Sequence, residues 1–95
     1  MIIIYSISNC KYCDLAKDLL KNVKETIYIN CDIMISLNRE EFKKSMRNKI
    51  GREWKTFPMI FHDDIFIGGY DELCYFLAFN DEIREYYMID DADNF

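Results

Sequence analysis

The sequence predicts an α/β fold, and two observations near the N-terminus carry this prediction. Residues 2–7 are rich in β-branched side chains and almost continuously apolar, which is typical of a central strand buried on both faces. A helical pattern and a second strand at residues 26–31 follow within roughly thirty residues. Strand, helix and strand at this spacing predict a right-handed parallel crossover, because parallel strands need a long connection.

The connection between these two strands is predicted to be an amphipathic helix. Ser8 or Asn9 can cap its start, because short polar side chains accept hydrogen bonds from free backbone N–H groups. Apolar residues then recur at helical spacing: Cys13, Ala16, Leu19, Leu20 and Val23. One face of this helix is therefore expected to pack on the sheet.

A second helix is expected at residues 38–50. Its apolar face is predicted to hold Leu37, Phe42, Met46 and Ile50. Gly51 stands where a C-terminal cap is expected, since glycine readily adopts the left-handed conformation that ends many helices.

The last part of the chain is predicted to form a hairpin and a third helix. Residues 57–61 and 65–67 are apolar runs, and the polar residues 62–64 between them form a connection of the hairpin type. Residues 71–79 follow a helical pattern, and residues 81–88 are expected to continue it after a bend. The inward side chains of this helix are predicted to be Leu73, Phe76 and Leu77.

Length and composition predict one domain at residues 1–88 and an acidic tail at residues 89–95. With 51% apolar residues, three glycines and one proline, the chain is too hydrophobic to be disordered. A net charge of −5 disfavours nucleic acid as a partner, because phosphate binding depends on surplus Lys and Arg. No signal peptide or membrane span is recognisable, so we expect a cytoplasmic protein, and one that acts as a monomer.

Cys10 and Cys13 are the most informative residues, because they form a Cys-x-x-Cys pair where the first predicted helix begins. Free N–H groups and the helix dipole stabilise a thiolate at that position, and a loop after a central strand faces a crevice. This predicts a redox pair rather than half of a zinc site, since Cys31, Cys74 and His62 are not paired at ligand spacing. Cys31 and Cys74 are expected to be core thiols, and His62 a solvated turn residue.

Two further segments are expected to lie beside the thiols. A lone proline, Pro58, opens an apolar strand, and a cis bond before it would bring backbone close to the cysteines. Gly68-Gly69 separates a strand from a helix, and the start of that helix, with the Tyr70 N–H and Asp71, can hold a small zwitterionic ligand.

Taken together, these segments resemble the glutaredoxin family, in particular the compact dithiol glutaredoxins of bacterial and viral type. Cys10-Lys11-Tyr12-Cys13 is similar to the family's Cys-Pro-Tyr-Cys, and Thr56-Phe57-Pro58 to its Thr-Val-Pro with cis proline. Gly68-Gly69-Tyr70-Asp71 is similar to its Gly-Gly-x-Asp/Thr turn. All three occur in the family's order, within a resemblance that covers residues 2–80.

The resemblance implies a thioredoxin-like fold, a four-stranded mixed sheet in the order strand, helix, strand, helix, strand, strand, helix. It implies an enzyme that reduces protein disulfides and glutathione mixed disulfides, with glutathione as reducing co-substrate and no metal. Cys10 is then the nucleophile and Cys13 the resolving thiol. The implied glutathione groove consists of Lys11, Tyr12, Lys55, Thr56, Phe57, Pro58, Gly69, Tyr70 and Asp71. Ribonucleotide reductase is one protein substrate that the resemblance suggests.

The chain departs from the family pattern at two positions, which keep two other functions open. Ile7 stands where the family commonly has Lys or Arg, and Lys11 stands where it has proline. One alternative is a carrier of a [2Fe–2S] cluster, since proline at that position is associated with disfavouring a shared cluster. The other is a thioredoxin-like reductant recycled by a flavoenzyme, although thioredoxins usually carry Trp where Asn9 stands.

Trp54 and Phe57 allow two interpretations. They can pack the loop before Pro58, or they can form a hydrophobic rim that contacts protein substrates. The sequence favours neither over the other.

Overall fold

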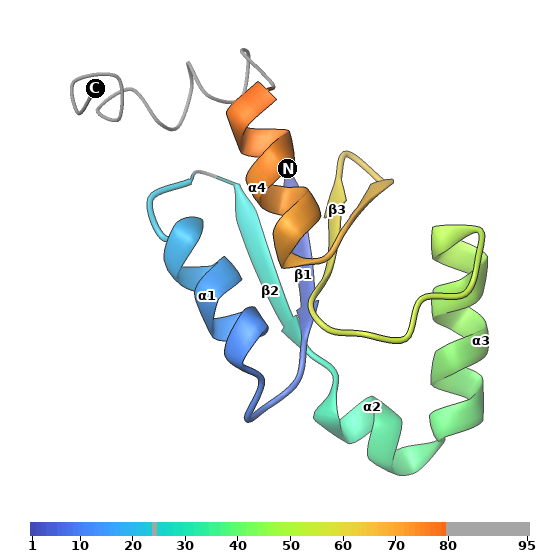
Figure 1. The fold of residues 1–95 in the computed structure, drawn as a ribbon. Coiled ribbons are helices and arrows are strands. Elements are labelled where there is room, and N and C mark those ends of the chain that lie inside the picture. Colours follow the sequence, from blue (N-terminus) through green and yellow to red (C-terminus); the bar gives the residue numbers. More distant parts are fainter. Residues whose placement is uncertain (24, 80–95) are drawn as a thin grey trace.

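A four-stranded mixed sheet forms the centre of the computed structural model, which describes residues 1–23 and 25–79. The strands lie in the order β2-β1-β3-β4 (Figure 1). β1 (Ile2–Ser6) pairs in parallel with β2 (Thr26–Asn30), and antiparallel with β3 (Met59–His62). β4 (Ile65–Gly68) pairs antiparallel with β3. The predicted α/β class, the parallel crossover and the central position of the first strand are therefore confirmed.

Helices cover both faces of this sheet (Figure 1). α1 (Lys11–Leu19) and α4 (Tyr70–Phe79) pack on one face, and α3 (Arg39–Ile50) packs on the other. A short helix, α2 (Asp32–Leu37), links β2 to α3. The expected helix at residues 81–88 and the acidic tail lie outside the described residues.

Alternation along β1 divides the core into two clusters, because successive side chains of a strand point to opposite faces. On the side of α1 and α4, Ile2 and Ile4 are fully buried against a cluster that also holds Ala16, Leu20, Ile60, Leu73 and Leu77. On the side of α3, Ile3 and Tyr5 pack against a cluster built around Met46, Met59 and Phe61. The inward residues predicted for the third helix are confirmed, with Phe76 packed at the cluster's edge.

The α1 helix is shorter than predicted. It ends at Leu19, and Leu20 is its C-cap, although Leu20 and Val23 still bury their side chains in the core. Apolar spacing therefore indicated the buried face correctly but extended the helix by one turn.

The sequence also missed α2, and this error misplaced Leu37. Asn38 has an extended backbone that ends α2, and its side chain accepts a hydrogen bond from the Glu41 N–H at 3.1 Å. Leu37 therefore belongs to the preceding helix and is 80% exposed, rather than lying on the apolar face of α3. The predicted cap at Gly51 is confirmed, with φ of +88°.

His62 was also predicted in the wrong place. It is the last residue of β3, and its ring centre lies 5.1 Å from that of Phe76, so it is partly buried rather than in the turn. The turn consists of Asp63 and Asp64, both at positive φ, as a two-residue hairpin of type I′ requires.

Replacing Ile60 by Val tests whether the core is close-packed at the centre of the sheet. Ile60 is fully buried in β3, so removal of one methylene group is expected to lower the free energy of unfolding by about 1 kcal/mol. Ile65→Val is the matched control, because Ile65 lies in the neighbouring strand and is 71% exposed; its expected cost is below about 0.5 kcal/mol. Urea unfolding measures both values, and equal costs would contradict the described packing.

Candidate active site

Cys10 is the N-cap residue directly before α1, and its sulfur caps the helix. Its backbone is extended, and its Sγ accepts a hydrogen bond from the Cys13 N–H at 3.2 Å. The predicted caps, Ser8 and Asn9, are wrong: Asn9 has a φ of +56°, and this turn places the cap one residue later. A helix N–H group therefore points directly at the sulfur.

Cys10 and Cys13 form a disulfide in this structure, with their Cα atoms 5.2 Å apart. The two residues differ in accessibility, because Cys13 is fully buried in the first turn of α1 while Cys10 is partly exposed. The pair can thus pass between dithiol and disulfide, and a partner molecule reaches Cys10 first.

The loop before β3 lies against this sulfur. The peptide bond between Phe57 and Pro58 is cis, as the sequence predicted, and Pro58 is buried. The carbonyl oxygen of Phe57 is 3.7 Å from Cys10 Sγ. Backbone that is distant in sequence therefore borders the redox sulfur.

The glycine turn before α4 adjoins the same loop. A Cβ atom added to Gly69 would lie 3.5 Å from the Pro58 carbonyl oxygen, which shows how closely the two backbones approach. The ring centres of Tyr12 and Tyr70 are 5.9 Å apart, so the starts of α1 and α4 are also in contact. Contacts in the structure thus connect the three segments that the sequence analysis singled out.

The other residues predicted for the glutathione groove are exposed: Lys11, Lys55, Thr56 and Asp71. Lys11 Nζ is 6.0 Å from the centre of the Tyr12 ring. Within residues 1–23 and 25–79, Lys55, Thr56 and Asp71 form no hydrogen bond with either cysteine. A neighbour of Asp71, Glu72, accepts a hydrogen bond from the Gly69 N–H at 2.8 Å and so caps the start of α4.

A clamp that the sequence analysis missed holds the loop in front of Cys10. Asp32 accepts two hydrogen bonds from Ser8, from the backbone N–H at 3.0 Å and from the hydroxyl at 2.5 Å. These bonds, the hydroxyl bond first, hold the pKa of Asp32 below its ordinary value of 3.8. Ser6 pairs with Asn30 in the parallel ladder. Two residues further along each segment, the same register brings Ser8 next to Asp32. Register between β1 and β2 is the signal that could have revealed this contact.

The two remaining cysteines differ from each other. Cys31 is fully buried, as predicted, and burial raises the pKa of its thiol to about 11. Cys74 is only partly buried on α4, so it is less buried than the predicted core position requires.

Within residues 1–23 and 25–79, no three His, Cys, Asp or Glu side chains gather so that they could hold a metal ion.

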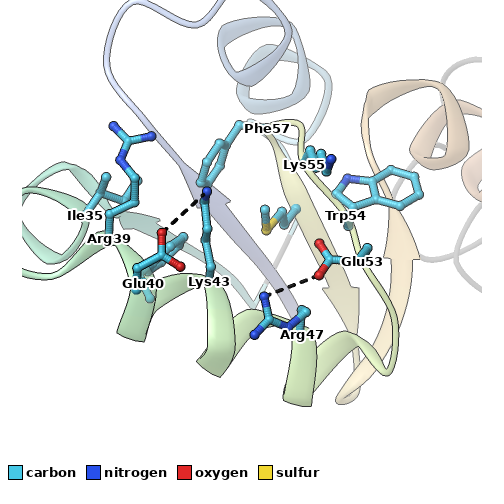
Figure 2. Close-up of a pocket in the computed structure, with 11 residues that line it drawn as sticks. Ile35, Arg39, Glu40, Lys43, Arg47, Glu53, Trp54, Lys55 and Phe57 are labelled. Atoms are coloured by element: carbon cyan, nitrogen blue, oxygen red, sulfur yellow. Dashed lines mark ion pairs between the residues drawn. The ribbon is translucent and has the colours of Figure 1, made fainter.

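A cavity of about 640 Å³ opens between α3 and the loop before Pro58 (Figure 2). Trp54 and Phe57 both line it, and both also pack against the core cluster beneath α3. The packing interpretation of these two aromatic residues is therefore confirmed. Both residues also border a hollow surface, and their contact with protein substrates stays a prediction.

No helix within the described part of the chain is long and apolar enough to span a membrane.

The chain is similar to glutaredoxins in sequence and in structure. Residues 2–67 match the family model for glutaredoxin. Glutaredoxin 1 of Rickettsia prowazekii is 39% identical over 72 residues, which cover 76% of this chain and 72% of that protein. The crystal structure of glutaredoxin 1 from Francisella tularensis complexed with cacodylate has a TM-score of 0.69 at 30% identity, covering 88% of this chain and 95% of that chain. Reduced glutaredoxin of Escherichia coli has a TM-score of 0.65 at 30% identity, covering 85% and 96%.

Replacing Asp32 by Asn tests the clamp through its pH dependence. Since the pKa of Asp32 is lowered in the folded state, its charge stabilises the fold above its ordinary value of 3.8, and this stabilisation is lost as the pH falls through the lower folded value. Wild type is therefore expected to be more stable than the variant at pH 7, and the difference should shrink at acidic pH. Urea unfolding at several pH values measures it.

Asp14→Asn is the matched control, because Asp14 also lies in the first turn of a helix, where the dipole favours a negative charge. It should show a smaller dependence on pH. A wild-type advantage over Asp32→Asn that stays constant from pH 7 to pH 2 would contradict the role given to the Asp32 charge.

Proposed function

The chain belongs to the glutaredoxin family, whose members are thiol-disulfide oxidoreductases, and we propose that it takes its electrons from glutathione. Its proposed substrates are protein disulfides and mixed disulfides of proteins with glutathione. One observation carries the proposal: the accessible sulfur of Cys10 accepts the Cys13 N–H at a helix start, beside the Phe57 carbonyl. A thiolate formed there meets a positive helix terminus and has a backbone edge next to it that can pair with a peptide.

The proposed reaction balances as two thiol-disulfide exchanges. The Cys10 thiolate attacks one sulfur of the substrate disulfide, so a Cys10–substrate bond forms and the other substrate sulfur leaves as a thiolate. Cys13, once deprotonated, attacks Cys10 Sγ, which releases the reduced substrate and leaves the Cys10–Cys13 disulfide. Two glutathione molecules then reduce this disulfide and leave as glutathione disulfide. In the monothiol route, Cys10 takes the glutathionyl group from a mixed disulfide and a second glutathione removes it.

Several groups together are proposed to make Cys10 a thiolate. An unperturbed thiol with a pKa of about 8.5 is only ~3% ionised at pH 7, and each tenfold gain in thiolate requires about 1.4 kcal/mol. A helix terminus contributes about 0.3 to 2 kcal/mol, which alone is too little for full ionisation. The Cys13 N–H bond and the Lys11 charge in the same loop are proposed to supply the rest.

Glutathione is proposed to bind across the loop and the start of α4. Phe57 backbone groups would pair with the tripeptide, Lys55 would meet a carboxylate, and Asp71 would meet the γ-glutamyl ammonium group. The exposed carboxylate of Asp71 supports this role, since Glu72 beside it already accepts the Gly69 N–H. The remaining residues proposed for the groove are Lys11, Tyr12, Thr56, Pro58, Gly69 and Tyr70.

We further propose that the protein works as a monomer in the cytoplasm, where a glutathione pool keeps thiols reduced. One chain contains both thiols that the dithiol route requires. Among protein substrates, ribonucleotide reductase is the one that the family resemblance suggests.

A glutathione assay coupled to glutathione reductase tests the proposed function. Cys10→Ser is expected to lose all activity, because it lacks the attacking sulfur. Cys13→Ser is expected to lose reduction of protein disulfides but to retain removal of glutathione from mixed disulfides, which needs only Cys10. Cys74→Ser is the matched control, since it also removes one thiol, and it should behave as wild type. NADPH consumption measures all three.

Two outcomes of this assay would contradict the proposal. Equal loss of both activities in Cys13→Ser would point to a strictly dithiol, thioredoxin-like mechanism. Turnover by wild type with a flavoenzyme thioredoxin reductase, but not with glutathione, would assign the reductant to that enzyme.

Replacing Lys11 by Gln tests the contribution of the loop cation. The variant is expected to raise the pKa of Cys10, so that iodoacetamide alkylation of Cys10 at pH 6 slows by about two- to threefold, as the loss of one exposed charge implies. Lys17→Gln is the control, because it removes the same charge from the last turn of α1. Alkylation rates followed across pH by mass spectrometry measure the effect, and an unchanged profile would remove Lys11 from the explanation.

A further inference from the structure

We propose that the cavity between α3 and the loop before Pro58 binds an acidic segment of the substrate protein, close to the cysteine that Cys10 attacks. This inference rests on the proposed function and adds a substrate class to it: disulfide proteins that carry carboxylates within a few residues of the disulfide. Its argument comes from the position, the charge and the lining of the cavity.

The cavity and the redox centre share one residue. The carbonyl oxygen of Phe57 is 3.7 Å from Cys10 Sγ, while the Phe57 ring lines the cavity. That ring stacks on Phe42 of α3, with 6.1 Å between ring centres and 22° between planes. A substrate chain that places a disulfide at Cys10 therefore has its neighbouring residues within reach of the cavity.

The cavity is cationic, although the chain as a whole carries a net charge of −5. Four side chains that line it are positive and two are negative. The negative ones already have partners: Glu53 pairs with Arg47 at 3.3 Å, and Glu40 with Lys43 at 4.0 Å.

Two cations of the lining have no ion-pair partner among the described residues, and one of them, Lys55, also belongs to the proposed glutathione groove. Arg39 and Lys55 form no ion pair with any residue in the part of the chain that the structure describes. Figure 2 shows Arg39 on one side of Phe57 and Lys55 on the other. The carboxylates of a substrate segment can therefore pair with a positive side chain on either side of the Phe57 ring.

The lining also explains why a peptide segment fits better than a lone anion. Phe42, Phe57 and Met59 present apolar surface between the charged groups, and a volume of about 640 Å³ is far more than one carboxylate fills. An acidic residue next to an apolar one satisfies both parts of this lining. The cavity shares Lys55 and Phe57 with the proposed glutathione groove, whereas Tyr12, Gly69 and Tyr70 do not line it.

The cations of the cavity also counteract the electrostatic repulsion between this acidic protein and an acidic substrate. A net charge of −5 repels acidic partners, and a positive patch beside the reacting sulfur attracts and orients them at the one place where the reaction occurs. The proposal therefore predicts a preference that is expressed in kcat/KM and weakens as salt is added.

Two peptides and two double variants test the proposal. Each peptide contains one internal disulfide; Asp residues flank it in the first peptide and Asn residues in the second. Arg39→Gln with Lys43→Gln removes two cations from the cavity, whereas Lys44→Gln with Lys49→Gln removes two from α3 outside it, with the same change in net charge. The glutathione-coupled assay gives kcat/KM for each pair, and bis(2-hydroxyethyl) disulfide serves as a small neutral reference.

Wild type is expected to prefer the Asp peptide, and the cavity variant to lose about five- to tenfold in kcat/KM for that peptide alone, as the loss of two partly exposed charge contacts implies. The Asn peptide and the neutral disulfide should be unaffected, as should all substrates with the variant outside the cavity. An equal loss in both double variants would attribute the effect to net charge and overturn the proposal.

Two other results would also overturn it. Equal kcat/KM of wild type for the two peptides would contradict an acidic substrate class while leaving the glutathione-dependent activity intact. A raised KM for glutathione in the cavity variant, with unchanged peptide preference, would assign the cavity to the reductant. Absence of turnover of all three disulfides with glutathione would instead refute the proposed function itself.

Discussion

The site depends on one contact, the hydrogen bond from the Cys13 N–H to Cys10 Sγ at the start of α1. Side-chain oxygens usually occupy this position at helix starts, and here a sulfur does. The contact places a group that can become negative where free N–H groups and the helix dipole are positive. The same three-residue spacing allows the disulfide, so stabilisation of the sulfur and its oxidation have one geometric origin.

The fold holds this contact in place from both sides. β1 is central in the sheet and its register with β2 carries Ser8 to Asp32, which restrains the loop that leads into Cys10. Behind the contact, Cys13 is fully buried, and Ala16 one turn later belongs to the core cluster shared with α4. Rotation of α1 would expose these residues, so core packing keeps Cys13 inside and Cys10 at the surface.

Patterns that are local in sequence predicted most of the fold, and the errors come from local turn geometry and from contacts between distant segments. The continuous apolar run of β1 and the cap at Gly51 are properties of neighbouring residues, so the sequence is sufficient for them. The cap at Cys10 could not be predicted, because it depends on the left-handed turn at Asn9, and the preference of Ser and Asn for caps pointed to the wrong residue. The clamp of Ser8 on Asp32 and the cavity beside α3 require strand register and helix packing, which no single segment encodes.

The two faces of the sheet carry different features of the site, and Phe57 connects them. The face of α1 and α4 buries Cys13 and sets the position of the redox sulfur, while the face of α3 carries the hollow, cationic surface. The carbonyl oxygen of Phe57 lies near the sulfur, and its ring borders the cavity. Under the substrate role proposed for the cavity, substitutions on α3 change which partners bind and leave the helix start that holds the sulfur untouched.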